Sequence, residues 1–331
     1  MSSLKEVAKL ANVSIATVSR VVSGAEYVSE STRKTVLKAV HKLDYKPNKV
    51  AQRLRSKSGN KKLIGLIVPD IQNPFYVDVV RGVEDMCYSN NFAVFMCNFA
   101  QDETKERLYL DLMKSEAVDG LILAPASEKD VEVIKLVKSG LPVVCVDRSL
   151  KEVDVDSVVV DNRNGAFSAV EFLINRGYKK IAYLGGLPNI PTTIQRQRGY
   201  TDALVKNGFK LNESFILTGD SKHISGKKMA TELLEMDNPP DALFTGNNLI
   251  TLGALEVIHN KGLKIPDDIA IIGFDDMPWS ISLNPPLTAV SQPGYEIGRR
   301  AADMLFNRIA EPERENVQLV LNTKLVIRDS C

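Results

Sequence analysis

From Leu63 onward, short apolar runs alternate with longer stretches in which apolar residues recur at helical spacing. The runs, rich in Val, Ile and Leu, are 63–68, 92–97, 120–123, 142–146, 157–160, 181–184, 242–245 and 269–274, and a helix is expected at 164–176. Continuous apolar runs between helices are typical of parallel strands that are buried on both faces. The pattern therefore predicts an α/β fold with parallel, doubly wound sheets.

Roughly 260 residues of such alternation exceed one sheet, so we expect two doubly wound lobes. Lobe one should comprise about residues 63–161 and 291–325, and lobe two about 162–290. In open α/β sheets a ligand lies outside the carboxyl ends of the strands. This rule predicts a binding site in the crevice between the lobes.

The N-terminal part carries a different pattern, with three short stretches of helical spacing. Residues 4–11, 15–22 and about 31–43 predict helices. Asn12 tolerates the left-handed backbone of a tight turn, and the Ser14 hydroxyl can cap the second helix. Two helices joined in this way form a helix-turn-helix, whose second helix enters the major groove of DNA. A generic three-helix bundle would show similar periodicity. The expected inward positions are Val18, Val21, Val22, Val36, Leu37, Val40 and Leu43.

Charge separates the two parts of the chain, although the whole has a formal net charge of only +1. Residues 1–62 contain fourteen Lys and Arg against four Asp and Glu, a local charge of +10, which leaves −9 on the remainder. A basic head on a mildly acidic body is typical of nucleic-acid binding. A solubilising tail would also be basic, but it would lack the regular apolar spacing.

A short basic segment joins the two parts. Pro47 suits the first turn of a helix, and 48–55 can form one or two helical turns, too few to be stable alone in water. Residues 56–62 have the composition of a flexible linker. We therefore expect a headpiece at 1–46, a hinge helix and linker at 47–62, and a core at 63–331.

Several classes of protein are disfavoured by what the sequence lacks. No stretch approaches the roughly 18 apolar residues of a membrane span, and the N-terminus has no apolar signal core, so we expect a cytoplasmic protein. The four cysteines show no metal-ligand spacing, which favours reduced thiols. Phosphate-binding glycine motifs, nucleophile elbows and zinc-binding histidine motifs are missing from the sequence. We predict no enzymatic activity, no metal and no cofactor.

Polar residues gather where the expected strands end. Each alone could be a helix cap or a loop residue. Together, carboxylates, guanidiniums and amides beside two aromatic rings suit a neutral polyhydroxylated ligand, because hydroxyls both donate and accept hydrogen bonds. The candidate effector-binding residues are Asn73, Phe75, Tyr76, Asp147, Arg148, Arg196, Asn247, Asp275 and Gln292.

Three segments carry a family resemblance: LKEVA at 4–8, VSIATVSRV at 13–21, and YKPN at 45–48 followed by Ala51 and Leu54. They resemble the headpiece and hinge of the lactose/purine repressor family of bacterial transcriptional regulators. The resemblance implies a homodimer whose paired hinge helices insert Leu54 into the minor groove of a pseudo-palindromic operator. An ordinary buried leucine remains the alternative.

The same resemblance assigns DNA contacts to the second helix and the hinge. It implies base readout by Ile15, Ala16 and Arg20, with a phosphate contact as the alternative for Arg20. The candidate DNA-binding residues are Ser14, Ile15, Ala16, Thr17, Ser19, Arg20, Asn48, Ala51, Leu54 and Arg55.

The body is similar to the type I periplasmic-binding-protein fold that these repressors share with sugar-binding proteins. Eight of the nine candidate effector residues fall where the ribose-binding branch contacts its sugar, and Tyr76 takes a second aromatic position. The match implies a pentose such as ribose. Ile190 and Ser221 depart from relatives that carry an arginine and an aromatic residue there. The sequence thus predicts a transcriptional repressor controlled by a small carbohydrate, expected to act as an inducer. The alternative is a catabolite-control-type regulator with a phosphocarrier protein as co-repressor.

Overall fold

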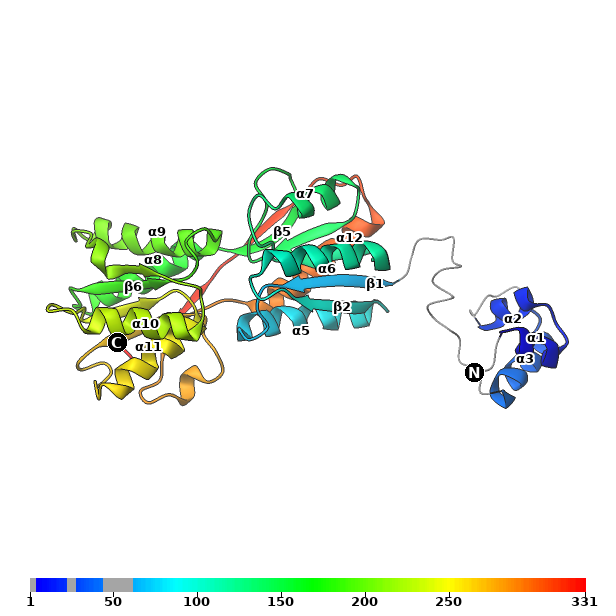
Figure 1. Cartoon of the computed structure of the whole chain (residues 1–331), viewed down its shortest axis with the longest axis horizontal. Helices are drawn as coiled ribbons and strands as arrows, with labels where there is room; N and C mark the ends of the chain where they lie inside the picture. Colours follow the sequence, from blue (N-terminus) through cyan, green and yellow to red (C-terminus); the bar gives the residue numbers. More distant parts are fainter. Residues whose placement is uncertain (1–3, 23–27, 44–61) are drawn as a thin grey trace. The chain divides into compact units, whose positions relative to one another are not determined.

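The computed structural model describes residues 4–22, 28–43 and 62–331 of the chain. The chain separates into two compact units, Met1–Lys61 and Lys62–Cys331, here called the headpiece and the core (Figure 1). The expected hinge helix at 48–55 lies outside the described residues.

The headpiece contains three helices, α1 (Leu4–Ala11), α2 (Ile15–Val22) and α3 (Glu30–Lys42). Between α1 and α2, Asn12 has a φ of 51°, and the Val13 N–H donates to the Ala8 carbonyl at 3.1 Å. The Ser14 hydroxyl accepts from the Thr17 N–H at 3.0 Å and so caps α2. The left-handed turn and the cap predicted from the sequence are confirmed.

The headpiece core is small and is formed by all three helices. Its buried side chains are Val7, Ala8, Ala11, Val18, Val21, Val36 and Ala39. The expectation that Leu37 points inward is wrong, because this side chain is 49% exposed. The buried face of α3 follows Val36, Ala39 and Val40, and a residue directly after Val36 is turned about 100° away around the helix.

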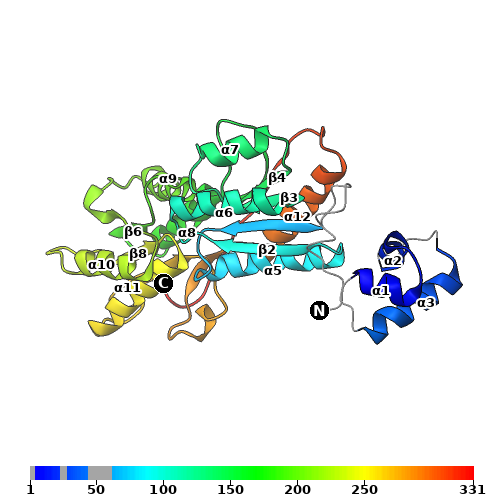
Figure 2. The same ribbon diagram turned by 45° about the vertical axis from the view of Figure 1, so that its right-hand side comes forward.

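Lobe one of the core is built on a six-stranded parallel sheet with the order β11-β5-β4-β3-β1-β2. Alternate residues of its strands pack against helices on opposite faces. Figures 1 and 2 show β1 and β2 between α5 and α6. The strands are β1 (Leu63–Val68), β2 (Ala93–Asn98), β3 (Gly120–Leu123), β4 (Val143–Val146), β5 (Asp156–Val160) and β11 (Gln318–Leu321). Helices α5 (Pro74–Ser89) and α12 (Gly294–Ala310) cover one face, and α6 (Glu103–Glu116) and α7 (Val131–Lys138) cover the other.

Helices α5 and α12 cross closely because each has a glycine at the crossing. A Cβ added to Gly82 would lie 2.1 Å from the Tyr295 carbonyl oxygen, and one added to Gly298 would lie 2.0 Å from the Val79 carbonyl oxygen. Real side chains never approach backbone so closely, so any other residue would push the helices apart. The close crossing holds the start of α5, and with it Asn73 and Phe75, at the edge of the sheet.

Lobe two repeats this architecture with the strand order β12-β10-β9-β8-β6-β7. Among the described strands of this sheet, β12 runs antiparallel to β10, and the other neighbours are parallel. The strands are β6 (Ile181–Gly185), β7 (Ile216–Thr218), β8 (Ala242–Thr245), β9 (Ala270–Phe274), β10 (Thr288–Ser291) and β12 (Lys324–Val326). Helices α8 (Asn162–Asn175) and α9 (Pro191–Lys206) cover one face, and α10 (His223–Leu234) and α11 (Asn248–Asn260) cover the other. Short 3-10 helices lie at Glu213–Phe215 and Ser280–Ser282.

The chain passes between the lobes after β5, after β10 and after β11, and Figure 1 shows the last passage as the red segment. The expected end of lobe one at about residue 325 differs from the structure, because Leu325 of β12 pairs with Val290 in lobe two. The Arg328 guanidinium then binds both carboxylate oxygens of Asp276 at 2.8 and 2.9 Å. β11 and β12 are short and half-exposed, so their periodicity does not say which sheet they join.

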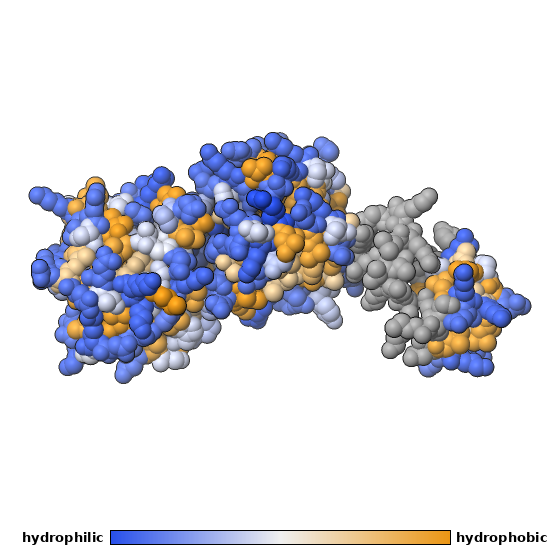
Figure 3. Space-filling model, viewed as in Figure 1, coloured by the Kyte–Doolittle hydropathy of each residue, from blue (hydrophilic) through white to orange (hydrophobic). Residues whose placement is uncertain are grey.

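The outer surface of the two lobes mixes polar side chains with small apolar patches in the view of Figure 3. Across the described segments, each helix is too short or too polar to cross a bilayer. All four cysteines are buried and free of disulfides.

Candidate ligand pocket and DNA-binding surface

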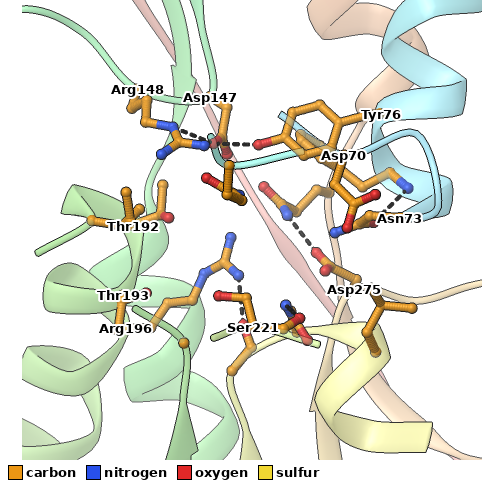
Figure 4. Close-up of a pocket in the computed structure, with 18 residues that line it drawn as sticks. Asp70, Asn73, Tyr76, Asp147, Arg148, Thr192, Thr193, Arg196, Ser221 and Asp275 are labelled. Atoms are coloured by element: carbon orange, nitrogen blue, oxygen red, sulfur yellow. Dashed lines mark hydrogen bonds and ion pairs between the residues drawn. The ribbon is translucent and has the colours of Figure 1, made fainter. Parts of the chain in front are cut away.

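A polar cavity of about 60 Å³ lies between the two lobes of the core (Figure 4). All nine candidate effector-binding residues line it, although they come from distant parts of the chain. The carboxyl ends of both parallel sheets thus meet at one site, as the strand-end rule predicts.

The lobe-one wall begins at the start of α5. Asn73 caps this helix, since its side-chain oxygen accepts from the Phe75 N–H at 2.9 Å. The rings of Phe75 and Tyr76 meet edge to face with centroids 5.0 Å apart and form an apolar side of the cavity. Burial raises the pKa of the Tyr76 hydroxyl, which stays protonated and donates to the Asp147 carboxylate at 2.9 Å. Arg148 Nε lies 3.5 Å from the same carboxylate oxygen.

The lobe-two wall is organised around Arg196 and Asp275. Arg196 donates from Nε to the Asn162 side-chain oxygen at 2.8 Å and from Nη1 to the Gly246 carbonyl at 2.6 Å. The Gln292 amide donates to the Asp275 carboxylate, which also accepts from the Asn248 N–H at 3.4 Å. Burial raises the pKa of Asp275, while the nearby Arg196 guanidinium opposes that shift.

Four residues of the cavity have left-handed backbone. The φ angles are 61° at Gln101, 66° at Asp147, 68° at Ser221 and 80° at Asp275. For residues with a Cβ this conformation costs free energy, and it is concentrated at functional sites. In each lobe it turns an aspartate that follows a strand toward the cavity.

Three buried polar atoms of the wall have no hydrogen-bond partner among the residues that the structure describes: Arg148 Nε, Arg148 Nη1 and Gln292 Oε1. The two Arg148 atoms are donors, and Gln292 Oε1 is an acceptor. Leaving such groups unpaired costs about 1–3 kcal/mol each, so the cavity is suited to a ligand that supplies both acceptors and a donor.

Strand-end reasoning missed several residues of the wall. Asp70 follows β1, Gln101 follows β2, and Thr192 and Thr193 lie in the first turn of α9. The same rule, applied to every strand and helix start, would have found them. The further lining residues are Gly186, Ile190, Ser221, Gly246 and Leu249. Within the described ranges, no cluster of three His, Cys, Asp or Glu side chains is suited to a metal ion.

The candidate DNA-binding residues that the structure describes lie in α2 and at Ser14, which caps it. Ser14, Ile15, Ala16, Ser19 and Arg20 are exposed and Thr17 is half-buried, whereas Val18 and Val21 face the core. The second helix therefore presents its candidate contact residues outward. Asn48, Ala51, Leu54 and Arg55 lie outside the described residues.

A helix-turn-helix headpiece together with a two-lobed core that holds a polar cavity defines a ligand-responsive DNA-binding regulator. Residues 3–48 match the family of bacterial regulatory proteins called the lacI family, and residues 61–328 match the periplasmic binding proteins and sugar binding domain of that family. The chain belongs to the LacI family of transcriptional repressors. It is a DNA-binding repressor with a ligand-binding domain rather than an enzyme.

Two relatives illustrate the range of the family. The chain is 34% identical to the transcriptional repressor PurR of Aliivibrio salmonicida, over all of this chain and 99% of the relative. It is 38% identical to catabolite control protein A of Priestia megaterium, over 91% of this chain and 90% of the relative.

Two solved structures are similar over the whole core or more. The lac repressor dimer bound to operator and an anti-inducer is 26% identical, with a TM-score of 0.86, and the match covers 99% of this chain and 98% of that one. A LacI-family regulator from Enterococcus faecium with bound ribose is 29% identical, with a TM-score of 0.74, over 81% of this chain and 98% of that one.

Proposed function

We propose that the protein is a cytoplasmic homodimeric repressor whose operator binding is controlled by a neutral monosaccharide, with a pentose such as ribose as the first candidate. The observation that carries this proposal is the pairing of a free buried donor on Arg148 with a free buried acceptor on Gln292 in one small cavity. A sugar hydroxyl both donates and accepts, so one ligand class satisfies both.

The charges of the cavity favour a neutral ligand. Three carboxylates, from Asp70, Asp147 and Asp275, face two guanidiniums, from Arg148 and Arg196. A phosphorylated sugar would add negative charge where carboxylates already predominate. The aromatic walls and the ribose-bound relative both support a monosaccharide.

The proposed domains are a headpiece at 1–46, a hinge at 47–62 and a core at 63–331. Two headpieces of a dimer would bind the half-sites of a pseudo-palindromic operator, with Ile15, Ala16 and Arg20 at the bases and Leu54 as a minor-groove wedge. The sugar would act as an inducer by binding more tightly to the lobe arrangement that releases DNA, because only differential affinity shifts the equilibrium.

Calorimetric titration of the full chain with D-ribose, other pentoses, hexoses, sugar phosphates and purines tests the ligand class. D-ribose should bind, and Asp275→Asn should abolish binding, whereas Asp267→Asn at an exposed site of the same lobe should leave it unchanged. Tight binding of a sugar phosphate or a purine in place of the neutral sugars would refute the proposal.

Operator binding is tested on a duplex selected from a random library. Leu54→Ala should weaken binding to that duplex while leaving D-ribose binding intact, and the affinity should fall steeply with salt. Unchanged affinity in Leu54→Ala would remove the wedge from the proposal.

The 38% identity with catabolite control protein A supports one alternative, a co-repressor role for a phosphocarrier protein. In that case, adding the phosphocarrier protein should strengthen the complex with the selected duplex when no sugar is present. Under the favoured proposal, it should have no effect.

A further inference from the structure

A pair of asparagine side chains joins the two lobes beside the cavity. Asn248 is the first residue of α11 in lobe two and is fully buried, and Asn73 caps α5 in lobe one. The Asn248 Nδ2 donates to the Asn73 Oδ1 at 2.7 Å, although the two residues are 175 positions apart in the chain. Asn248 does not line the cavity, and sequence reasoning singled out only its neighbour Asn247.

This contact determines how the Asn73 amide is oriented. Its oxygen accepts two hydrogen bonds, from the Phe75 N–H at 2.9 Å and from Asn248 at 2.7 Å. A carbonyl oxygen has two lone pairs, so its acceptor capacity is filled. The amino group of Asn73 is then left as the donor of this side chain toward the cavity.

Asn248 is also bonded within lobe two. Its backbone N–H faces the Asp275 carboxylate at 3.4 Å, and the Nδ2 that donates to Asn73 also lies 3.5 Å from the Met277 sulfur. Asn248 therefore connects the lobe-one cap residue with the buried aspartate of lobe two.

We infer that Asn248 is an inter-lobe positioning residue: its amide holds the lobes together at Asn73 and orients the Asn73 amino group into the cavity. The bond exists only when the lobes are close, so it stabilises the closed arrangement in the absence of a ligand. For a ligand that binds the closed lobes, the Asn73 part of the site is then already formed before binding. The inference goes beyond the identity of the effector and does not depend on the proposed sugar.

Two matched substitutions separate the tether from the ligand contact. In Asn248→Asp, a carboxylate replaces the amide that donates to Asn73. Its oxygens should repel the Asn73 Oδ1 and the nearby Asp275 carboxylate. Asn73→Asp keeps an acceptor for both Phe75 N–H and Asn248 Nδ2, but it removes the donor that faces the cavity. Asn248→Ala deletes the bond without adding charge.

The distance between the lobes is measured by electron–electron double resonance in the full chain without ligand. Spin labels are attached at Lys129→Cys in lobe one and Lys222→Cys in lobe two, both exposed, while the four native cysteines are buried. Mixing with excess unlabelled chain isolates the distance within one subunit. Asn260→Asp, at the exposed end of the same helix α11, is the control.

Asn248→Asp should broaden the distance distribution toward longer values, and Asn248→Ala should raise the ratio of open to closed molecules about two- to tenfold, as expected for one hydrogen bond. Asn73→Asp and Asn260→Asp should retain the wild-type distribution. Wild-type distributions in both Asn248 variants would overturn the inference, and so would opening of the lobes by Asn73→Asp.

Titration with D-ribose then tests the second part of the inference. Asn73→Asp should weaken D-ribose binding even though the lobe distance is unchanged. If wild-type protein does not bind D-ribose, the proposed function fails, while the distance measurements still decide the role of Asn248.

Discussion

The Arg196 guanidinium, which lines the cavity, lies 3.7 Å from the centroid of the fully buried Phe274 ring. Stacking on the ring and two hydrogen bonds, to Asn162 and to Gly246, hold the group in one orientation. A planar guanidinium combines these contacts, and a lysine ammonium does not. The cavity thus contains a positively charged group whose position is set before any ligand arrives.

Replacing this arginine by lysine tests the importance of its geometry as distinct from its charge. Arg196→Lys should lower the affinity for D-ribose by about tenfold or more, because charge-assisted bonds contribute about 1.5–3 kcal/mol each. Calorimetry measures the loss. Arg198→Lys, on the exposed side of the same helix, should bind D-ribose normally. Equal affinity of Arg196→Lys and wild type would show that charge alone suffices.

Glu106 makes the stability of lobe one depend on pH. Its carboxyl is buried and accepts from the Ala126 N–H at 3.0 Å. Burial and the neighbouring Asp130 raise its pKa from 4.5 to about 8. The folded state therefore binds a proton that the unfolded state releases, and the free energy of unfolding should fall as the pH rises from about 4.5 to about 8.

Glu106→Gln keeps the shape and the neutral charge of the protonated form. Its stability relative to wild type should therefore increase as the pH rises toward 8. Urea unfolding at fixed protein concentration, near pH 4.5 and near pH 8, measures the change in this difference. Glu103→Gln, exposed in the first turn of the same helix, serves as the control. A constant difference between Glu106→Gln and wild type would contradict the raised pKa.

Asp156 connects the start of β5 to the end of α12. Its carboxylate accepts from Arg308 Nε at 2.9 Å and from the Val317 N–H at 2.8 Å, and its side chain is fully buried. Asp156→Ala should lower the free energy of unfolding by about 3–5 kcal/mol, because it leaves a largely buried guanidinium without its counter-charge. Asp154→Ala, exposed two residues earlier, should change urea unfolding little. A similar small effect at Asp156 would argue against the ion pair.

Ser14 should protect the first turn of α2 from hydrogen exchange. Ser14→Ala removes the cap on the Thr17 N–H, and loss of such caps costs about 0.5–2 kcal/mol. Amide exchange of α2 in the full chain should accelerate in Ser14→Ala and be largely restored in Ser14→Asn. Ser19→Ala, exposed within the same helix, should not accelerate exchange. Identical exchange in Ser14→Ala and wild type would exclude a stabilising cap.

Local patterns predicted much of this molecule. Apolar runs correctly placed β1 to β5 in lobe one and β6, β8 and β9 in lobe two, and Asn12 and Ser14 predicted the turn and the cap of the headpiece. Shorter, half-exposed strands such as β7, β11 and β12 escaped prediction, since few of their residues are buried on both faces. Leu37 was misplaced because a helical spacing is compatible with more than one buried face.

The sequence by itself determined the α/β class, the helix-turn-helix, the basic head and the polar residues at strand ends, because each is a property of neighbouring residues. Only the tertiary structure decided that Asn248 reaches Asn73, that Arg196 stacks on Phe274, and that the chain re-enters lobe two at β12. These contacts join residues far apart in the chain. The first depends on how the two lobes close on each other, and the other two depend on how distant elements pack within lobe two. No local periodicity records either arrangement.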